Sequence, residues 1–319
     1  MKITQNYFEQ YLKQNYIFEK VPRIAIAVSG GPDSICLLFL LNNWIKKNKG
    51  SLIALIVDHQ LRKESSLEAR HISNYLSSKN ILSKIIKIQK KNIEKKTMEE
   101  ARNNRFNCLL NYCKKNSTLH LFVGHHFDDN LETFLIRKIA GSNFEGLRSI
   151  KNKMISNNIQ VLRPLIDVNK KDIFTYNELH KIKFVSDPTN YNLNYTRTIV
   201  RNFLLSENSD INNIKKDFEI IRENYEYYKK MIFHSFHDVL IKINNRSIFI
   251  DDKKFYFKDV LIQSKIIEII YKYLKFSRDP LRYKKIRYSL DKLKKPTTSK
   301  LNLAGLMIKK ENLMIKFTS

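Results

Sequence analysis

A glycine pair followed by an aspartate stands between two apolar segments near the N-terminus, in the stretch SGGPDS at residues 29–34. Glycine lets a chain turn where a Cβ would clash, and successive N–H groups that lead into a helix N-terminus bind anions. The serine hydroxyls add donors, and proline suits the first position of a helix, where its missing N–H would be unpaired anyway. We therefore expect a phosphate-binding loop made by Ser29, Gly30, Gly31, Pro32, Asp33 and Ser34.

The composition of this loop separates it from two familiar phosphate-binding motifs. It has no lysine and lacks the spacing G-x-x-x-x-G-K-[ST], so it is not a P-loop, and it is not the dinucleotide motif G-x-G-x-x-G either. A plain turn between a strand and a helix is the alternative. That alternative is the weaker one, since the five defined positions of S-G-G-x-D-S recur by chance in a chain of this length with a frequency on the order of 10⁻⁴.

A second polar stretch, GHHFDDNLET at residues 124–133, carries two histidines, His125 among them, and two aspartates. Glu132 follows Asp129 by three residues, so both carboxylates lie on one face of a helix. The same residues could serve structure alone, with Asp129 as the helix N-cap and Glu132 as the third residue of a capping box. A zinc site is disfavoured, because the histidines are adjacent and no cysteine is near.

Two pairs of arginines stand at helical spacing. Arg102 and Arg105 lie in MEEARNNRF, where ion pairs along the helix are the ordinary explanation. Arg197 and Arg201 lie one turn apart in YTRTIVR. That second pair fits either a phosphate clamp or a solvated helix face, and the sequence leaves both interpretations open.

The elements that must position these residues alternate between short apolar runs and longer amphipathic ones. Strands are expected at 24–28, 52–57, 81–88 and 119–123, and helices at 34–47, 65–79, 98–115 and 129–139. Apolar runs without polar alternation are typical of strands covered on both faces, so we expect a doubly wound α/β domain with a mostly parallel sheet. Ligands bind beyond the carboxyl ends of such strands, where SGGPDS, DHQLR and GHHFDD stand.

The pattern changes near Glu207, which divides the chain into a catalytic domain at 1–206 and a second domain at 207–319. Beyond the break we expect a long helix to about residue 241 and a hairpin around RSIFIDDKKFYF. Helices at 259–275 and 281–294 and strands within 300–317 should follow. The second domain is therefore expected to be small, basic and of the α+β class.

The net charge of the chain indicates a polyanionic binding partner. Lysine and arginine number 58 against 31 aspartates and glutamates, a formal net charge of +27. Charge spread over solvated faces, as a result of genomic base composition, is the alternative. The longest apolar run near the N-terminus is too short for a membrane span and no signal core is present, so a cytoplasmic protein with no membrane partner is expected.

The order of the motifs SGGxDS, VDHxLR, E-x-AR-x-x-R, HHxDDxxET, RPL and DPTN…R-x-x-x-R resembles the tRNA(Ile)-lysidine synthetases, a family of the N-type ATP pyrophosphatases, which carry a PP-loop. The resemblance spans about residues 20–205. Two places depart from the family pattern. GSNFEGL stands where the family has a glycine-rich G-S-G-L-x-G-L, and Thr198 follows Arg197 where the family has asparagine.

The resemblance implies an ATP-dependent ligase that joins free L-lysine to C2 of the wobble cytidine in tRNA(Ile) with a CAU anticodon. An adenylated cytidine would form with release of pyrophosphate, and AMP would leave as lysine attacks. ATP and Mg²⁺ are the implied cofactors, with Asp33 near the magnesium-bound phosphates. Arg105 and Arg197 would brace the α-phosphate or the tRNA, and His125 would lie next to the reacting phosphate. Asp129 and Glu132 would hold the lysine amine.

Two other functions stay open at this point. A tRNA-thiolating relative would need a cysteine pair or an iron–sulfur ligand set, whereas Cys36 lies in an apolar helix and Cys108 and Cys113 face different ways on another. A non-catalytic basic RNA-binding protein on a degenerate ATP-binding fold is the second alternative. The residues leave the oligomeric state open, a homodimer included.

Overall fold

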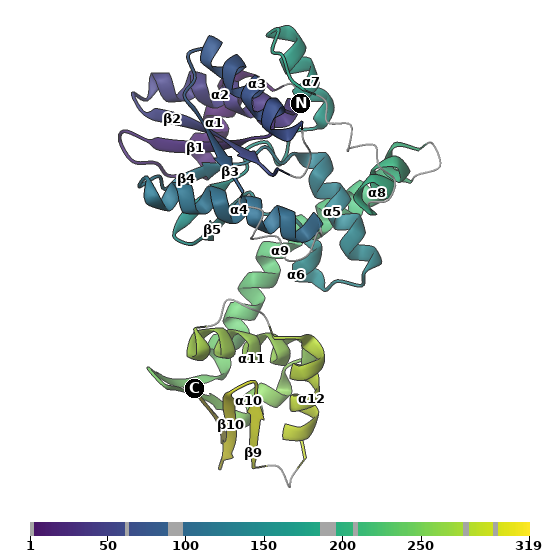
Figure 1. Cartoon of the computed structure of the whole chain (residues 1–319). Helices are drawn as coiled ribbons and strands as arrows, with labels where there is room; N and C mark the ends of the chain where they lie inside the picture. Colours follow the sequence, from purple (N-terminus) through teal and green to yellow (C-terminus); the bar gives the residue numbers. More distant parts are fainter. Residues whose placement is uncertain are drawn as a thin grey trace. The chain divides into compact units, whose positions relative to one another are not determined.

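The computed structural model describes residues 3–60, 64–88, 98–185, 196–206, 210–276, 281–295 and 299–319. It divides into two compact units, Met1–Glu219 and Ile220–Ser319 (Figure 1). The domain boundary expected at Glu207 falls outside the described residues and stays a prediction. No helix in the described part of the chain is both long and apolar enough to cross a membrane.

The first unit contains a six-stranded sheet in the order β3-β2-β1-β4-β6-β5. Its strands are β1 (Arg23–Val28), β2 (Ser51–Asp58), β3 (Ser83–Lys87), β4 (His120–Phe122), β5 (Lys153–Ser156) and β6 (Ile159–Leu162). All neighbours pair in parallel except β5, which is antiparallel to β6. Because β1 pairs with both β2 and β4, the order of the strands reverses between β1 and β4, and the doubly wound α/β fold is confirmed.

The helices of the first unit cover both faces of this sheet. They are α1 (Gln5–Asn15), α2 (Pro32–Lys47), α3 (Ser65–Ser78), α4 (Met98–Lys115), α5 (Phe127–Ile139), α6 (Phe144–Leu147), α7 (Lys170–Leu179) and α8 (Thr196–Leu205). Ile24, Ile26 and Val28 pack in one core with α1, α2, α3 and α7, whereas Ala25 packs in a second core with α4. Alternate side chains of β1 thus face opposite layers, which explains its uninterrupted apolar run.

Several short elements of this unit are not among those expected from the sequence. The hairpin of β5 and β6 turns at Asn157 and Asn158, which have φ values of 49° and 65°. Asparagine tolerates this left-handed conformation, so the Asn-Asn pair is the feature of the sequence that could have predicted the turn of this hairpin. Helices α1 and α7 are also new, whereas the four expected strands and four expected helices are all present with ends shifted by a few residues.

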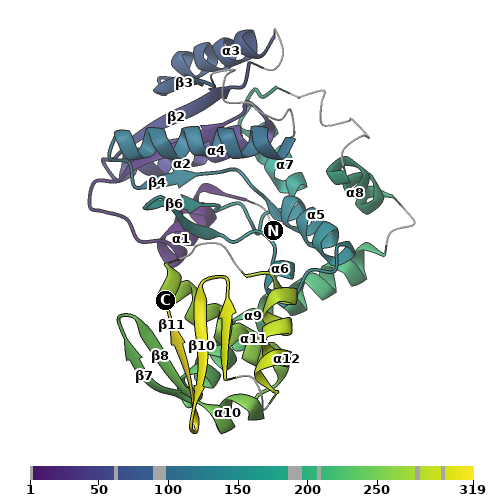
Figure 2. The same ribbon diagram turned by 60° about the horizontal axis from the view of Figure 1, so that its bottom comes forward.

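The second unit contains an antiparallel sheet in the order β7-β8-β11-β10-β9, and Figure 2 shows α11 and α12 alongside it. Its elements, after the helix α9 (Ile211–Val239) that enters it, are β7 (Leu240–Asn244), β8 (Ser247–Asp251), α10 (Asp252–Phe257), α11 (Val260–Lys275), α12 (Tyr283–Leu293), β9 (Lys300–Leu303), β10 (Leu306–Glu311) and β11 (Met314–Thr318). One apolar core joins α11, α12 and the sheet. The α+β class of this part is confirmed.

The hairpin expected around RSIFIDDKKFYF is confirmed for its first strand and wrong for its second. The segment SIFID forms β8, but its hairpin partner is the upstream strand β7, and the following residues form α10. The Asp251 side chain accepts a hydrogen bond from the Lys254 N–H at 2.8 Å, which caps a new helix at that point.

Replacement of Leu38 in α2 tests the packing that positions the loop before this helix. Leu38 is fully buried, so Leu38→Ala should lower the free energy of unfolding by about 2–5 kcal/mol, through lost burial and the cavity left behind. Leu67→Ala on α3 is the matched control, because Leu67 is 56% exposed and should change that free energy by about 0.5 kcal/mol or less. Urea unfolding measures both, and equal effects would contradict the packing described.

Candidate active site

The loop between β1 and α2 is held in shape by its own serines. The Ser29 N–H donates to Ser34 Oγ at 3.2 Å, and Ser34 Oγ donates to the Gly31 carbonyl at 3.1 Å. Gly30 has φ +85°, and a Cβ there would come within 2.5 Å of Ile72 Cδ1. The positive φ and the close contact therefore both favour glycine at this position.

Asp33 presents a carboxylate that the protein itself leaves incompletely bonded. Its Oδ1 is buried and accepts no hydrogen bond from the described residues. Burial raises the pKa of Asp33 despite the opposing charge of His126. A buried carboxylate oxygen without a donor suits a hard cation such as Mg²⁺, so Asp33 fits the metal that the resemblance implies.

Gly124 allows the loop after β4 to touch the loop after β1. A Cβ at Gly124 would lie 3.1 Å from the Asp33 carbonyl oxygen and 3.1 Å from Ser34 Cα. These are backbone atoms at the start of α2 and have little room to move. The two loops at the point where the strand order reverses are therefore in direct contact.

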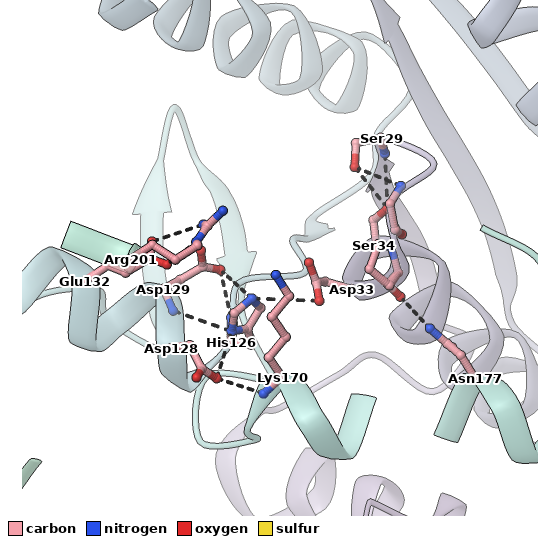
Figure 3. Close-up of polar contacts among 12 residues, drawn as sticks. Ser29, Asp33, Ser34, His126, Asp128, Asp129, Glu132, Lys170, Asn177 and Arg201 are labelled. Carbon is pink, nitrogen blue, oxygen red and sulfur yellow. Dashed lines mark hydrogen bonds and ion pairs between the residues drawn. The ribbon is translucent and has the colours of Figure 1, made fainter. Parts of the chain in front are cut away.

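His126 links these loops through its side chain, as Figure 3 shows. It is the N-cap of α5: the Asp129 N–H donates to His126 Nδ1 at 3.4 Å and the His126 N–H donates to Asp129 Oδ2 at 3.2 Å. The cap expected at Asp129 with Glu132 is therefore wrong by three residues. His126 replaces it because α5 begins at Phe127, two residues earlier than expected.

Three carboxylates surround the His126 imidazole. Nε2 lies 3.8 Å from Asp33 Oδ1 and 3.5 Å from Asp129 Oδ2, and Nδ1 lies 3.4 Å from Asp128 Oδ2. Burial alone would lower the pKa of His126, but the three carboxylates outweigh it and raise that pKa. In turn His126 and Arg197 hold the pKa of Asp129 below its usual range although that side chain is buried.

His125 has the opposite environment. Arg163, a buried side chain from the RPL motif, donates from Nε to His125 Nδ1 at 3.2 Å. Burial and then the charges of Arg163 and neighbouring arginines lower the pKa of His125 to about 3, against the attraction of Asp129. His125 is therefore neutral near pH 7, with Nε2–H available as a donor.

Glu132 is buried and joins α5 to α8. Arg197 Nε donates to its Oε2 at 2.7 Å, and Arg201 Nε donates to its Oε1 at 2.6 Å. Arg197 also bonds Asp129 Oδ1 at 3.0 Å. Both arginines thus pair with the acidic face of α5, so the interpretation of them as a solvated helix face is wrong, whereas the phosphate clamp stays a prediction. Both oxygens of Glu132 are occupied by these arginines.

Arg105 lies apart from this ion-pair network. Arg105 is an exposed residue of α4. The pKa of the His59 imidazole is lowered, first by the burial of His59 and second by the positive charge of Arg105. Arg62 of the VDHxLR motif and the DPTN motif at 187–190 fall outside the described residues. Gly124 and Arg163 belong to the site and were not singled out from the sequence, although GHH and RPL contain them.

The cysteines do not form a cluster. Cys36 belongs to the core on one face of the sheet and Cys113 to the core on the other, and burial raises the pKa of both thiols. Among the described residues, no group of three or more histidines, cysteines and carboxylates could hold a metal ion by itself. The arrangement offers no thiolate set for sulfur chemistry.

Comparisons with known proteins show the family to which the chain belongs. Residues 2–208 match the family model of the PP-loop domain. The chain is 44% identical over 194 residues to the tRNA(Ile)-lysidine synthase of Wolbachia pipientis wMel and 40% identical over 189 residues to that of Orientia tsutsugamushi, each match covering 59% of this chain. The chain spans 44% and 43% of the length of these relatives.

The fold is also similar to a solved structure, the U34-tRNA thiolase NcsA from Methanococcus maripaludis with its [4Fe-4S] cluster. The TM-score is 0.54 at 19% sequence identity, over 68% of this chain and 79% of that one. At this identity the likeness concerns the fold alone.

Replacement of His125 tests its neutral state. The unfolded chain binds a proton at this residue near the ordinary pKa of 6.5, whereas the folded chain binds it only near pH 3. Acidification between these values therefore favours unfolding, by up to about 1.4 kcal/mol per pH unit. His125→Gln should remove this contribution, so its unfolding free energy should depend less on pH between 6.5 and 4 than that of the unchanged protein. Parallel pH profiles from urea unfolding would show that His125 is protonated in the folded state.

Proposed function

Because the chain belongs to the PP-loop domain family, we propose that it uses ATP to join L-lysine to the wobble cytidine of a tRNA(Ile) with a CAU anticodon. The observation that carries the proposal is the contact between the two loops. His126 Nε2 lies 3.8 Å from Asp33 Oδ1, so the acidic start of α5 borders the SGGPDS loop. A cation-binding group and an anion-binding loop thus share one site.

In the first step, the C2 carbonyl oxygen of the cytidine attacks the α-phosphorus of ATP and pyrophosphate leaves. The N–H groups and hydroxyls of residues 29–34 bind the departing phosphates. Asp33 would hold magnesium, which when bound would offset the negative charge of those phosphates. His125 donates from Nε2–H toward the reacting phosphate, while Arg105 and Arg197 brace that phosphate or the tRNA.

In the second step, the ε-amine of lysine attacks C2 and AMP leaves with the former carbonyl oxygen. The amine has an ordinary pKa near ~10.4, so it must lose a proton before it attacks. We assign Asp129 to hold this amine and to accept its proton. An ionised carboxylate accepts more hydrogen bonds than the two that Arg197 and the His126 N–H give Asp129. Glu132 assists by keeping Arg197 and Arg201 in place.

The charge of the chain suits the RNA substrate. Residues 220–319 hold 23 lysines and arginines against 10 aspartates and glutamates. We assign this unit to the binding of tRNA phosphates, which should weaken as salt rises. The packed cysteines give no support to the thiolating alternative.

Incubation of the chain with ATP, Mg²⁺, radiolabelled lysine and total tRNA tests the proposal. Label should enter tRNA with one AMP and one pyrophosphate released for each lysine, because the two steps expel one of each. Release of AMP and pyrophosphate should require tRNA. Binding of tRNA without any ATP consumption would instead favour the non-catalytic alternative.

Asp129→Asn tests the place of lysine. The amide keeps the size of the side chain but removes its charge, so lysine transfer should fall by at least about 100-fold, the lower end of general acid–base contributions. The affinity for ATP should change little. Asp167→Asn, an exposed aspartate of the same unit, is the control and should retain full transfer. Near-native transfer by Asp129→Asn would rule out this role for Asp129.

A further inference from the structure

The loop at residues 29–34 contains no basic side chain, although the triphosphate that it is proposed to bind is strongly anionic. Backbone N–H groups and a helix N-terminus supply only partial charges. Apart from the metal that Asp33 would hold, a full positive charge near the loop has to come from a side chain of another element. Among the residues drawn around the loop in Figure 3, Lys170 extends beside His126 toward Asp33.

Lys170 is the first residue of α7, and this helix is fixed to both sides of the site. The Lys170 N–H donates to Asp128 Oδ2 at 2.7 Å, and the Phe127 N–H donates to the Val168 carbonyl at 2.9 Å. Further along α7, the fully buried Asn177 donates from Nδ2 to the Pro32 carbonyl at 3.0 Å. The start of α7 is thus bonded to α5, and a later turn of α7 is bonded to the first residue of α2, so contacts with the site fix the position of Lys170.

The Lys170 ammonium has no ion-pair partner among the residues that the structure describes. Its nearest recorded contact is the face of Phe174, 5.9 Å from the ring centroid, which is a weak cation–π interaction. A cation at the first position of a helix is also unfavourable to the helix dipole, so helix stability does not account for it.

We propose that Lys170 binds the β- and γ-phosphates of ATP, supplying from α7 the positive charge that the SGGPDS loop lacks. This assignment rests on the proposed use of ATP and adds to it a residue of the triphosphate site. Lys170 would hold the phosphates that leave as pyrophosphate, opposite the N–H groups of the loop. The neighbouring Lys171 is exposed and has no such role.

The full chain and its Lys170→Met, Lys170→Arg and Lys171→Met variants test the proposal by isothermal titration with ATP, pyrophosphate and AMP, each with Mg²⁺. Lys170→Met should weaken the binding of ATP and of pyrophosphate by about tenfold or more, because a charge-assisted contact is lost. Its affinity for AMP should change by no more than about twofold, since AMP lacks the two phosphates. Lys170→Arg should retain most of the affinity, and Lys171→Met should match the unchanged chain.

The outcomes separate this assignment from the proposed function. If the unchanged chain binds ATP and Lys170→Met binds ATP and pyrophosphate equally well, Lys170 has no phosphate role, while the proposed function stands. Equal losses for AMP and pyrophosphate would show a general distortion and would also overturn the assignment. If the unchanged chain binds neither ATP nor pyrophosphate, the proposed function fails and this assignment with it. Thermal unfolding without ligand verifies that each variant is folded.

Discussion

The close approach of two backbone segments is the constraint on which the site depends. Parallel pairing of β1 with β4 brings their carboxyl ends together, and Gly124 then lies against the carbonyl of Asp33 and the Cα of Ser34, where a Cβ would be only 3.1 Å from both. Because of this contact, a loop whose residues suit anion binding and a helix start rich in carboxylates are direct neighbours. Neither segment alone combines the two chemistries that joining an amine to an activated RNA base would need.

The electrostatics of the site follow from how each carboxylate is partnered. Burial raises the pKa of Asp33, whereas His126 and Arg197 lower that of Asp129 although burial opposes them. Glu132 is only 2% exposed and is neutralised by two arginines from α8. Because the three carboxylates have different environments, they suit different tasks. Under the proposed function, Asp33 would bind the metal, Asp129 would bind the amine, and Glu132 would have a structural role.

The sequence predicted the parts of this arrangement that depend on local signals. Uninterrupted apolar runs predicted the strands, and the ends of these runs predicted the polar loops. Both predictions succeed because strands and loops depend on residues that are close together in the sequence. The cap at His126 was missed since histidine is not a usual N-cap residue. The contacts of Arg163 with His125 and of Arg197 and Arg201 with Glu132 join residues 38, 65 and 69 positions apart, and such pairings arise only when the sheet assembles. In the second unit, the sequence did not show which neighbouring segment pairs with β8. The segment after β8 was expected to be its partner strand, but it forms a helix capped by Asp251, and β7 pairs with β8 instead.

A crystal structure of the chain with a non-hydrolysable ATP analogue and Mg²⁺ would show where the triphosphate binds. We expect the β- and γ-phosphates on the N–H groups of Gly30 and Gly31, the metal at Asp33, and the α-phosphate toward His125 and the start of α5. A nucleotide bound elsewhere, or a loop filled by the protein's own side chains at saturating analogue, would contradict this expectation.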